Sequence, residues 1–202
     1  HSILLMPGKS LLTPIGDIQF LEFSGSSNML FENAEEYTGN YFLKAKYDST
    51  MDFGDTVCIQ PSLYDVADAG CKVQNRKSYG GQGAPIAVTE VEEIIYPSGA
   101  GGEVEFRVHM ANRGSGKVKG VVLGKATLGN EEMECEFKGK DVGVIEGTVY
   151  TQKSVVLQED TQEALLICKT FLKDQNSYTT TLAIDFRYEY EWRGEYKLHL
   201  VR

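Results

Sequence analysis

The strongest constraint on the fold is a stretch near the C-terminus in which apolar and charged residues alternate. From residue 182 to residue 192 one parity is apolar or aromatic, and from residue 185 onward the other parity is charged. The apolar members are Leu182, Ile184, Phe186, Tyr188, Tyr190 and Trp192. Successive side chains of a strand point to opposite faces, whereas a helix would scatter these groups around its axis. The pattern therefore predicts a long, half-buried β-strand.

The end of the chain is predicted to form a hairpin with this strand. Arg193-Gly194 has the composition of a tight turn, and Tyr196, Leu198 and Leu200 share one parity after it. Two-residue turns that contain glycine join antiparallel strands. We therefore expect a last strand whose three apolar side chains face inward.

Further strands are predicted along the whole chain, because alternation recurs between glycine-rich turns. No window has a sustained period of 3.6 residues, and 21 Gly, 11 Tyr and 9 Phe suit strands and turns better than helices. The expected strands cover residues 18–23, 41–47, 55–60, 85–95, 104–110, 118–128, 133–137, 142–150, 154–157 and 164–171. The fold class is expected to be all-β, in the form of β-sandwiches.

A glycine-rich segment predicts where the chain divides. Three glycines fall within residues 80–84, a composition that suits a flexible join. A chain of 202 residues is long enough for two small domains. We predict an N-terminal β domain at residues 1–79, with an extended N-terminal arm, and a C-terminal β-sandwich at residues 80–202.

Four widely spaced cysteines predict two disulfides within these domains. Cys58 and Cys71 fall in the first domain, Cys135 and Cys168 in the second, and no C-x-x-C pair points to zinc. The natural pairing is Cys58–Cys71 with Cys135–Cys168, although four cysteines allow three pairings, and four buried free thiols are the alternative. Disulfides would indicate an oxidising compartment, or a hyperthermophile.

Charge and motifs exclude several functions. A formal net charge of −9 without a basic stripe argues against a nucleic-acid partner. No segment is long and apolar enough to span a membrane. His109 and His199 occupy polar parities and should face solvent, and no nucleotide-binding or hydrolase motif occurs in the right context. We therefore expect no enzymatic activity, no catalytic residues, no metal and no cofactor.

Acidic and aromatic groups in the sequence could bind ligands, but each group also has a structural explanation. Asp48, Asp52 and Asp55 offer oxygen ligands for calcium, but acidic groups in so acidic a chain usually serve solubility. The acidic groups at residues 90–93 and 131–134 are interpreted in the same way. The aromatic run from Tyr188 to Tyr196 is better explained as core than as a ligand platform. Tyrosines nearer turns are better candidates for an exposed interface: Tyr37, Tyr41, Tyr47, Tyr64 and Tyr79.

Parts of the sequence resemble known extracellular modules. Residues 88–91 and 102–118, which include an N-x-G-x-G turn, resemble the first two strands of CARDB-type Ig-like domains. Residues 57–61, 80–89 and 178–190 are similar to segments of archaeal secreted or membrane-anchored proteins. The resemblance implies an extracellular Ig-like module of archaeal surface proteins, and it implies no catalytic residues. Those proteins usually have a membrane tether, which this chain does not show. For the whole chain we expect two Ig-like β-sandwich domains with intradomain disulfides.

An apolar arm at the start of the chain gives the most specific functional prediction. Its apolar residues are Ile3, Leu4, Leu5, Met6, Leu11 and Leu12. The arm either folds back as the first strand of its own domain or completes the sheet of another subunit by strand addition. Head-to-tail donation generates a filament. We therefore expect an extracellular structural protein that self-associates into a filament or pilus, or binds other surface proteins; the alternative is a monomeric adhesin or carbohydrate-binding module.

Overall fold

The fold comes from a computed structural model of the 202-residue chain. It describes residues 14–15, 18, 20, 22, 24–26, 34–61, 70–98, 101–138, 142–146, 151–157, 163–172 and 176–201. Every regular element within these residues is a β-strand. The prediction of an all-β chain is confirmed for this part of the sequence.

Eleven strands are present in the described residues, and most of them match predicted ones. They are β1 (Glu36–Ile59), β2 (Arg76–Ser78), β3 (Ile86–Ser98), β4 (Gly101–Asn112), β5 (Lys117–Leu128), β6 (Glu131–Glu132), β7 (Glu134–Lys138), β8 (Val142–Glu146), β9 (Thr151–Leu157), β10 (Glu163–Leu172) and β11 (Tyr178–Val201). One difference is β1, which is continuous where two separate strands were expected. A second difference concerns residues 18–23, which were expected to form a strand. Their described members, Ile18, Phe20 and Glu22, are exposed and lie outside any strand.

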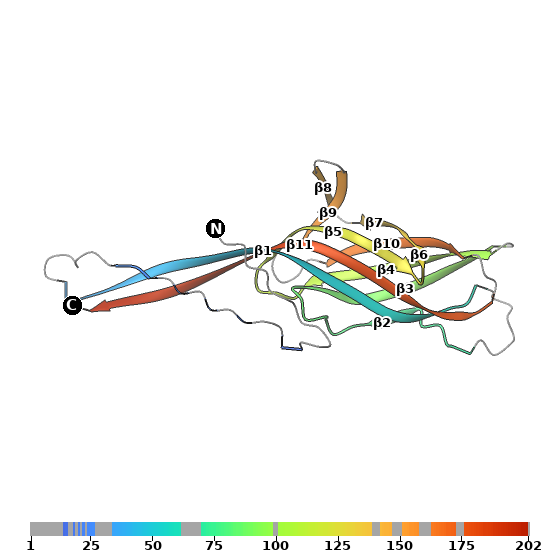
Figure 1. The fold of residues 1–202 in the computed structure, drawn as a ribbon, viewed down its shortest axis with the longest axis horizontal. Helices are drawn as coiled ribbons and strands as arrows, with labels where there is room; N and C mark the ends of the chain where they lie inside the picture. Colours follow the sequence, from blue (N-terminus) through green and yellow to red (C-terminus); the bar gives the residue numbers. More distant parts are fainter. Residues whose placement is uncertain are drawn as a thin grey trace. The chain divides into compact units, whose positions relative to one another are not determined.

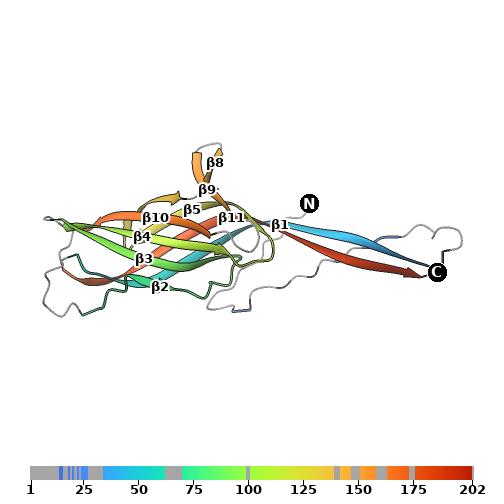
Figure 2. The same ribbon diagram turned by 180° about the vertical axis from the view of Figure 1, so that it is seen from behind.

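The strands form two sheets. One has the order β1-β11-β5-β9-β8, with β6 also paired to β5, and the other has the order β2-β3-β4-β10-β7 (Figure 1). Figure 2 shows the same fold from behind, with β2, β3 and β4 in the nearer layer. The two sheets enclose one continuous hydrophobic core, in which Phe106 of β4 and Phe186 of β11 are fully buried. The packing is that of a β-sandwich.

Period-two patterning places the core side chains as predicted. Leu182, Ile184 and Phe186 have no exposed surface, and Tyr188 and Tyr190 keep 5% or less. Interpreting this aromatic run as core rather than as a ligand platform is therefore confirmed for Tyr188 and Tyr190. Burial of each large side chain of this kind contributes about 1.5–3 kcal/mol to folding.

The predicted C-terminal hairpin is wrong. Strand β11 continues from Tyr178 through Arg193-Gly194 to Val201. Gly194 does not have the positive φ that the favoured hairpin turns require. Consequently Tyr196 and Leu198 do not face inward, and they are 42% and 51% exposed.

The chain divides into two compact units. The first contains residues 1–43 with 195–202, and the second contains residues 44–194. The core, both disulfides and the predicted join at residues 80–84 lie in the second unit. The join lies between β2 and β3, which are paired in one sheet.

The first unit carries several exposed apolar side chains. Its described strand segments are residues 36–43 of β1 and 195–201 of β11. Tyr41 stacks on Tyr196 with ring centroids 5.4 Å apart, and Thr38 contacts the His199 ring at 2.9 Å. Side chains at least 42% exposed in these segments are Tyr37, Tyr41, Phe42, Tyr196, Leu198 and Val201. Exposed apolar surface of this kind is a common feature of interaction sites.

Both predicted disulfides are present. Cys58 is bonded to Cys71 and Cys135 to Cys168, and no described cysteine is free. The second bond joins directly opposite residues of β7 and β10. Disulfides of this kind are typical of proteins from oxidising compartments.

Candidate functional site

The first part of the candidate site is an incomplete edge of the β3 sheet. Strand β2 pairs only with Glu90, Val91 and Glu92. Two further backbone bonds flank this pairing, from the Tyr79 amide to the Thr89 carbonyl and from the Glu93 amide to the Asn75 carbonyl, each at 2.8 Å. Within the described chain, the rest of β3 has no partner strand on this side. Backbone N–H and C=O groups point to alternate sides along a strand. The amide and carbonyl of Ile95 therefore point to the same side of β3 as those of Glu93, beyond the end of β2.

A groove follows this open edge. It has a volume of about 590 Å³. Its lining residues are Gln60, Val73, Asn75, Arg76, Glu92, Glu93, Ile94 and Ile95. An unpaired strand edge beside a groove with apolar and polar walls is the geometry that strand addition uses, since it offers main-chain hydrogen bonds and pockets for alternate side chains.

Glu93 links this groove to the interior of the sandwich. It shares the inward parity of Val91 and lies opposite Phe106 in the β3–β4 ladder. Its side chain is only 6% exposed, and Oε1 has no hydrogen-bond partner. Burial alone raises the pKa of Glu93 to about 7. A carboxyl group in this setting is half ionised near neutral pH.

Glu93 differs from the other buried carboxylates of the described chain. Glu105 bonds Arg107 at 2.7 Å and Lys169 at 2.9 Å, and Glu191 is surrounded by cations. Buried charges are normally paired in this way, because desolvation of an unpaired charge is costly. Glu93 alone among these three has a buried oxygen without a donor.

A second cavity, of about 210 Å³, is also lined by Glu93, and it borders the Cys58–Cys71 disulfide. In its wall, Lys77 donates to both carboxylate oxygens of Asp55 at 2.7 Å, and the Tyr79 hydroxyl donates to Oδ2 at 2.5 Å. Partial burial acts to raise the pKa of Asp55, but these hydrogen bonds outweigh it and lower that pKa. Lys77 therefore forms its ion pair with Asp55.

The three aspartates considered for calcium do not gather in one place. Asp48 and Asp52 are exposed on β1, and Asp55 is held by Lys77 and Tyr79. The one cluster of three potential metal ligands among the described residues is Glu90, Glu92 and His109, whose ligand atoms lie within 4.8 Å. Arg76 pairs with both of these glutamates, so a protein cation already lies beside this cluster.

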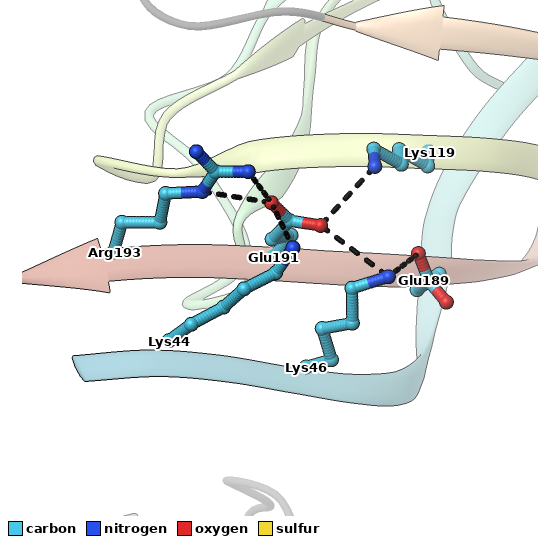
Figure 3. Close-up of polar contacts among 6 residues, drawn as sticks. All are labelled: Lys44, Lys46, Lys119, Glu189, Glu191 and Arg193. Carbon is cyan, nitrogen blue, oxygen red and sulfur yellow. Dashed lines mark hydrogen bonds and ion pairs between the residues drawn. The ribbon is translucent and has the colours of Figure 1, made fainter. Parts of the chain in front are cut away.

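A second charged cluster lies around Glu191 on β11 (Figure 3). Lys44 and Arg193 approach Oε1 at 3.0 and 2.8 Å, and Lys119 and Lys46 approach Oε2 at 3.2 and 3.4 Å. The carboxylate is 2% exposed. The hydrogen bond from Lys44 contributes most to lowering the pKa of Glu191, against the effect of burial. The cluster ties β1, β11 and β5 together, which is a structural role.

Replacing Glu191 with glutamine should destabilise the fold by leaving four cations around a neutral group. Because the folded-state pKa of Glu191 is lowered, its contribution is present above pH 4.5 and is lost as pH falls toward the folded-state pKa. We expect the midpoint of thermal unfolding to drop by several degrees at pH 7 and by less at pH 3, where part of this contribution is already lost. Glu189→Gln, which removes only the 3.8 Å contact with Lys46, is the control. Equal losses for both variants would contradict this account.

The structure places the remaining predicted residues as follows. His199 is exposed, as predicted, and contacts Glu36 at 3.4 Å. His109 does not simply face solvent, since its Nε2 is buried without a hydrogen-bond partner. Tyr37 and Tyr41 are about half exposed, which suits an interface. Tyr79 packs edge-on against Phe53. Tyr64 and the arm residues Ile3, Leu4, Leu5, Met6, Leu11 and Leu12 lie outside the described residues.

Sequence reasoning missed Glu93 and Glu191. Glu93 was grouped with its acidic neighbours, although its parity with Val91 and Ile95 was a usable signal of inward orientation. Glu191 belongs to the charged parity of the predicted strand, and its burial by cations from β1 and β5 has no signal within β11 itself.

Comparisons with known proteins give no further guidance. No family model, curated protein or solved structure matches this chain. The resemblance to CARDB-type domains therefore stays a prediction. Within the described residues, no helix has the length and apolar composition needed to cross a membrane.

Proposed function

We propose that this protein is a non-catalytic structural subunit of an extracellular filament, assembled when the N-terminal arm of one copy adds to the β3 edge of the next. The observation that carries the proposal is the groove beside the unpaired part of β3. An incoming strand would receive main-chain hydrogen bonds there and would extend the β2-β3-β4-β10-β7 sheet. The function rests on surface complementarity and needs no reacting group.

Two further features support the proposal. The arm carries six apolar residues that favour burial, and the first unit displays further exposed aromatic and aliphatic side chains. The disulfides suit a protein that works outside the cell, where thiols are oxidised.

Deletion of residues 1–14 should abolish polymers. The deletion removes the donor strand and leaves both sheets and both disulfides in place, so we expect a folded monomer. Negative-stain microscopy and light scattering of the full chain and the deletion variant provide the measurement. Full-length protein with Leu4→Ser and Leu5→Ser is the matched variant, which keeps the arm but weakens its apolar contacts. Polymers that persist after deletion would contradict the proposal, and a small monodisperse wild-type particle would favour a monomeric adhesin.

A further inference from the structure

The arm and the β3 groove have complementary charges. Lys9 is the only lysine or arginine within residues 1–43, and residues 1–14 contain no acidic residue. The whole chain carries a net charge of −9, so a single cation within an apolar segment stands out. The groove, in turn, contains a buried carboxyl group whose Oε1 has no donor.

We propose that Glu93 is the specificity-determining residue of the groove, and that it receives the ammonium group of Lys9 from a second copy of this chain. The inference rests on the proposed strand-addition function and names the recognition step within it. Alternate side chains of an added strand enter the pockets of the acceptor. The aliphatic stem of lysine can lie along apolar groove wall such as Ile95 while its ammonium group reaches the carboxylate.

The surroundings of Glu93 leave it available for this contact. The charged or titratable groups that line the adjoining groove and cavity are Asp55, Lys72, Arg76, Lys77, Tyr79 and Glu92. Lys77 is held by Asp55, and Arg76 is held by Glu90 and Glu92. Lys72 is exposed. Oε1 is itself buried, so a donor from outside the subunit has to enter along the groove to reach it, but it would not have to break an existing ion pair.

Pairing with a cation makes assembly depend on pH. Because burial raises the pKa of Glu93 to about 7, the group is mostly neutral at pH 6 and mostly ionised at pH 8. An ammonium group binds the ionised form better, so assembly should strengthen as pH rises through 7.

The test measures the critical concentration for polymerisation of the full chain at pH 6 and pH 8 by light scattering. We expect Lys9→Met and Glu93→Gln each to raise it by about tenfold or more at pH 8 and to remove the pH dependence, because each leaves one charge of the pair without its partner. Lys9→Arg keeps the cation and should assemble like the wild type. Lys125→Met, which removes an exposed lysine on β5, is the control and should have no effect.

The double variant Lys9→Met with Glu93→Gln separates direct contact from independent effects. A direct pair predicts that the double variant is no worse than either single variant, whereas independent roles predict additive losses. Additive losses would overturn the Glu93 inference. It would also be overturned if Lys9→Met assembled like the wild type at both pH values while deletion of residues 1–14 still abolished polymers. Either result would leave the proposed function standing. Polymers that survive the deletion would instead remove the proposed function.

Discussion

Glu93→Gln should raise the free energy of unfolding by about 3 kcal/mol at pH 8 and leave it nearly unchanged at pH 4. Burial raises the folded-state pKa of Glu93 from the ordinary 4.5 to about 7. Each pKa unit corresponds to about 1.4 kcal/mol. A raised pKa means that the folded state holds this proton more tightly, so the contribution of Glu93 to stability is fully present below pH 4.5 and is lost as pH rises through 7.

Urea denaturation at pH 4, 6 and 8 checks this prediction, at protein concentrations too low for assembly. The wild type should lose stability between pH 4.5 and pH 8, and Glu93→Gln should remove that slope, because an amide cannot ionise. Glu163→Gln, which neutralises an exposed carboxylate on β10, is the matched control. If the wild type and Glu93→Gln lose stability in parallel, Glu93 is not the group whose ionisation opposes folding.

The same residue connects stability with assembly. A buried carboxylate without a donor destabilises the isolated subunit, and a cation supplied by a neighbour would relieve that cost. The Glu93→Gln subunit should therefore be more stable alone and poorer at assembly. A site whose residues oppose the stability of the isolated fold is a common feature of functional surfaces.

Local patterning predicted the strands well, because period-two alternation is a property of each strand by itself. Residues 118–128 and 164–171 match β5 and β10 within one residue at either end. The failures concern continuity. Residues 48–51 and Arg193-Gly194 were expected to interrupt strands, but β1 and β11 run through them as neighbours in one sheet, and that pairing stabilises residues of poor intrinsic preference.

The candidate site was only partly predictable, because it depends on which strands become neighbours. The disulfide pairs and the apolar arm could be identified from residue type and spacing. The open edge of β3 could not, since it arises from the shortness of β2, a three-residue strand without an alternating pattern. Glu93 became significant only when Phe106 was found opposite it and a groove beside it.

Replacing Cys135 and Cys168 together by alanine should lower the free energy of unfolding by about 4 kcal/mol. The bond spans 33 residues, and the chain-entropy model gives about 4 kcal/mol for a loop of that length. Strand β7 pairs only with β10 within the described chain, so the bond also anchors an edge strand. Amide hydrogen exchange in residues 134–138 should therefore accelerate more than exchange in β4.

Alanine replacement of Cys58 and Cys71 provides the comparison for this prediction. That bond spans 13 residues, and the same model gives about 3 kcal/mol. In urea denaturation, the free energy of unfolding should be lower for the Cys135–Cys168 variant than for the Cys58–Cys71 variant. It should be lowest for wild-type protein under reducing conditions, which break both bonds. The reverse order would show that local contacts, such as the position of Cys58–Cys71 beside the Glu93 cavity, outweigh loop length. In that case the Cys58–Cys71 disulfide would contribute more to the stability of the subunit, and its reduction should weaken assembly as well as folding.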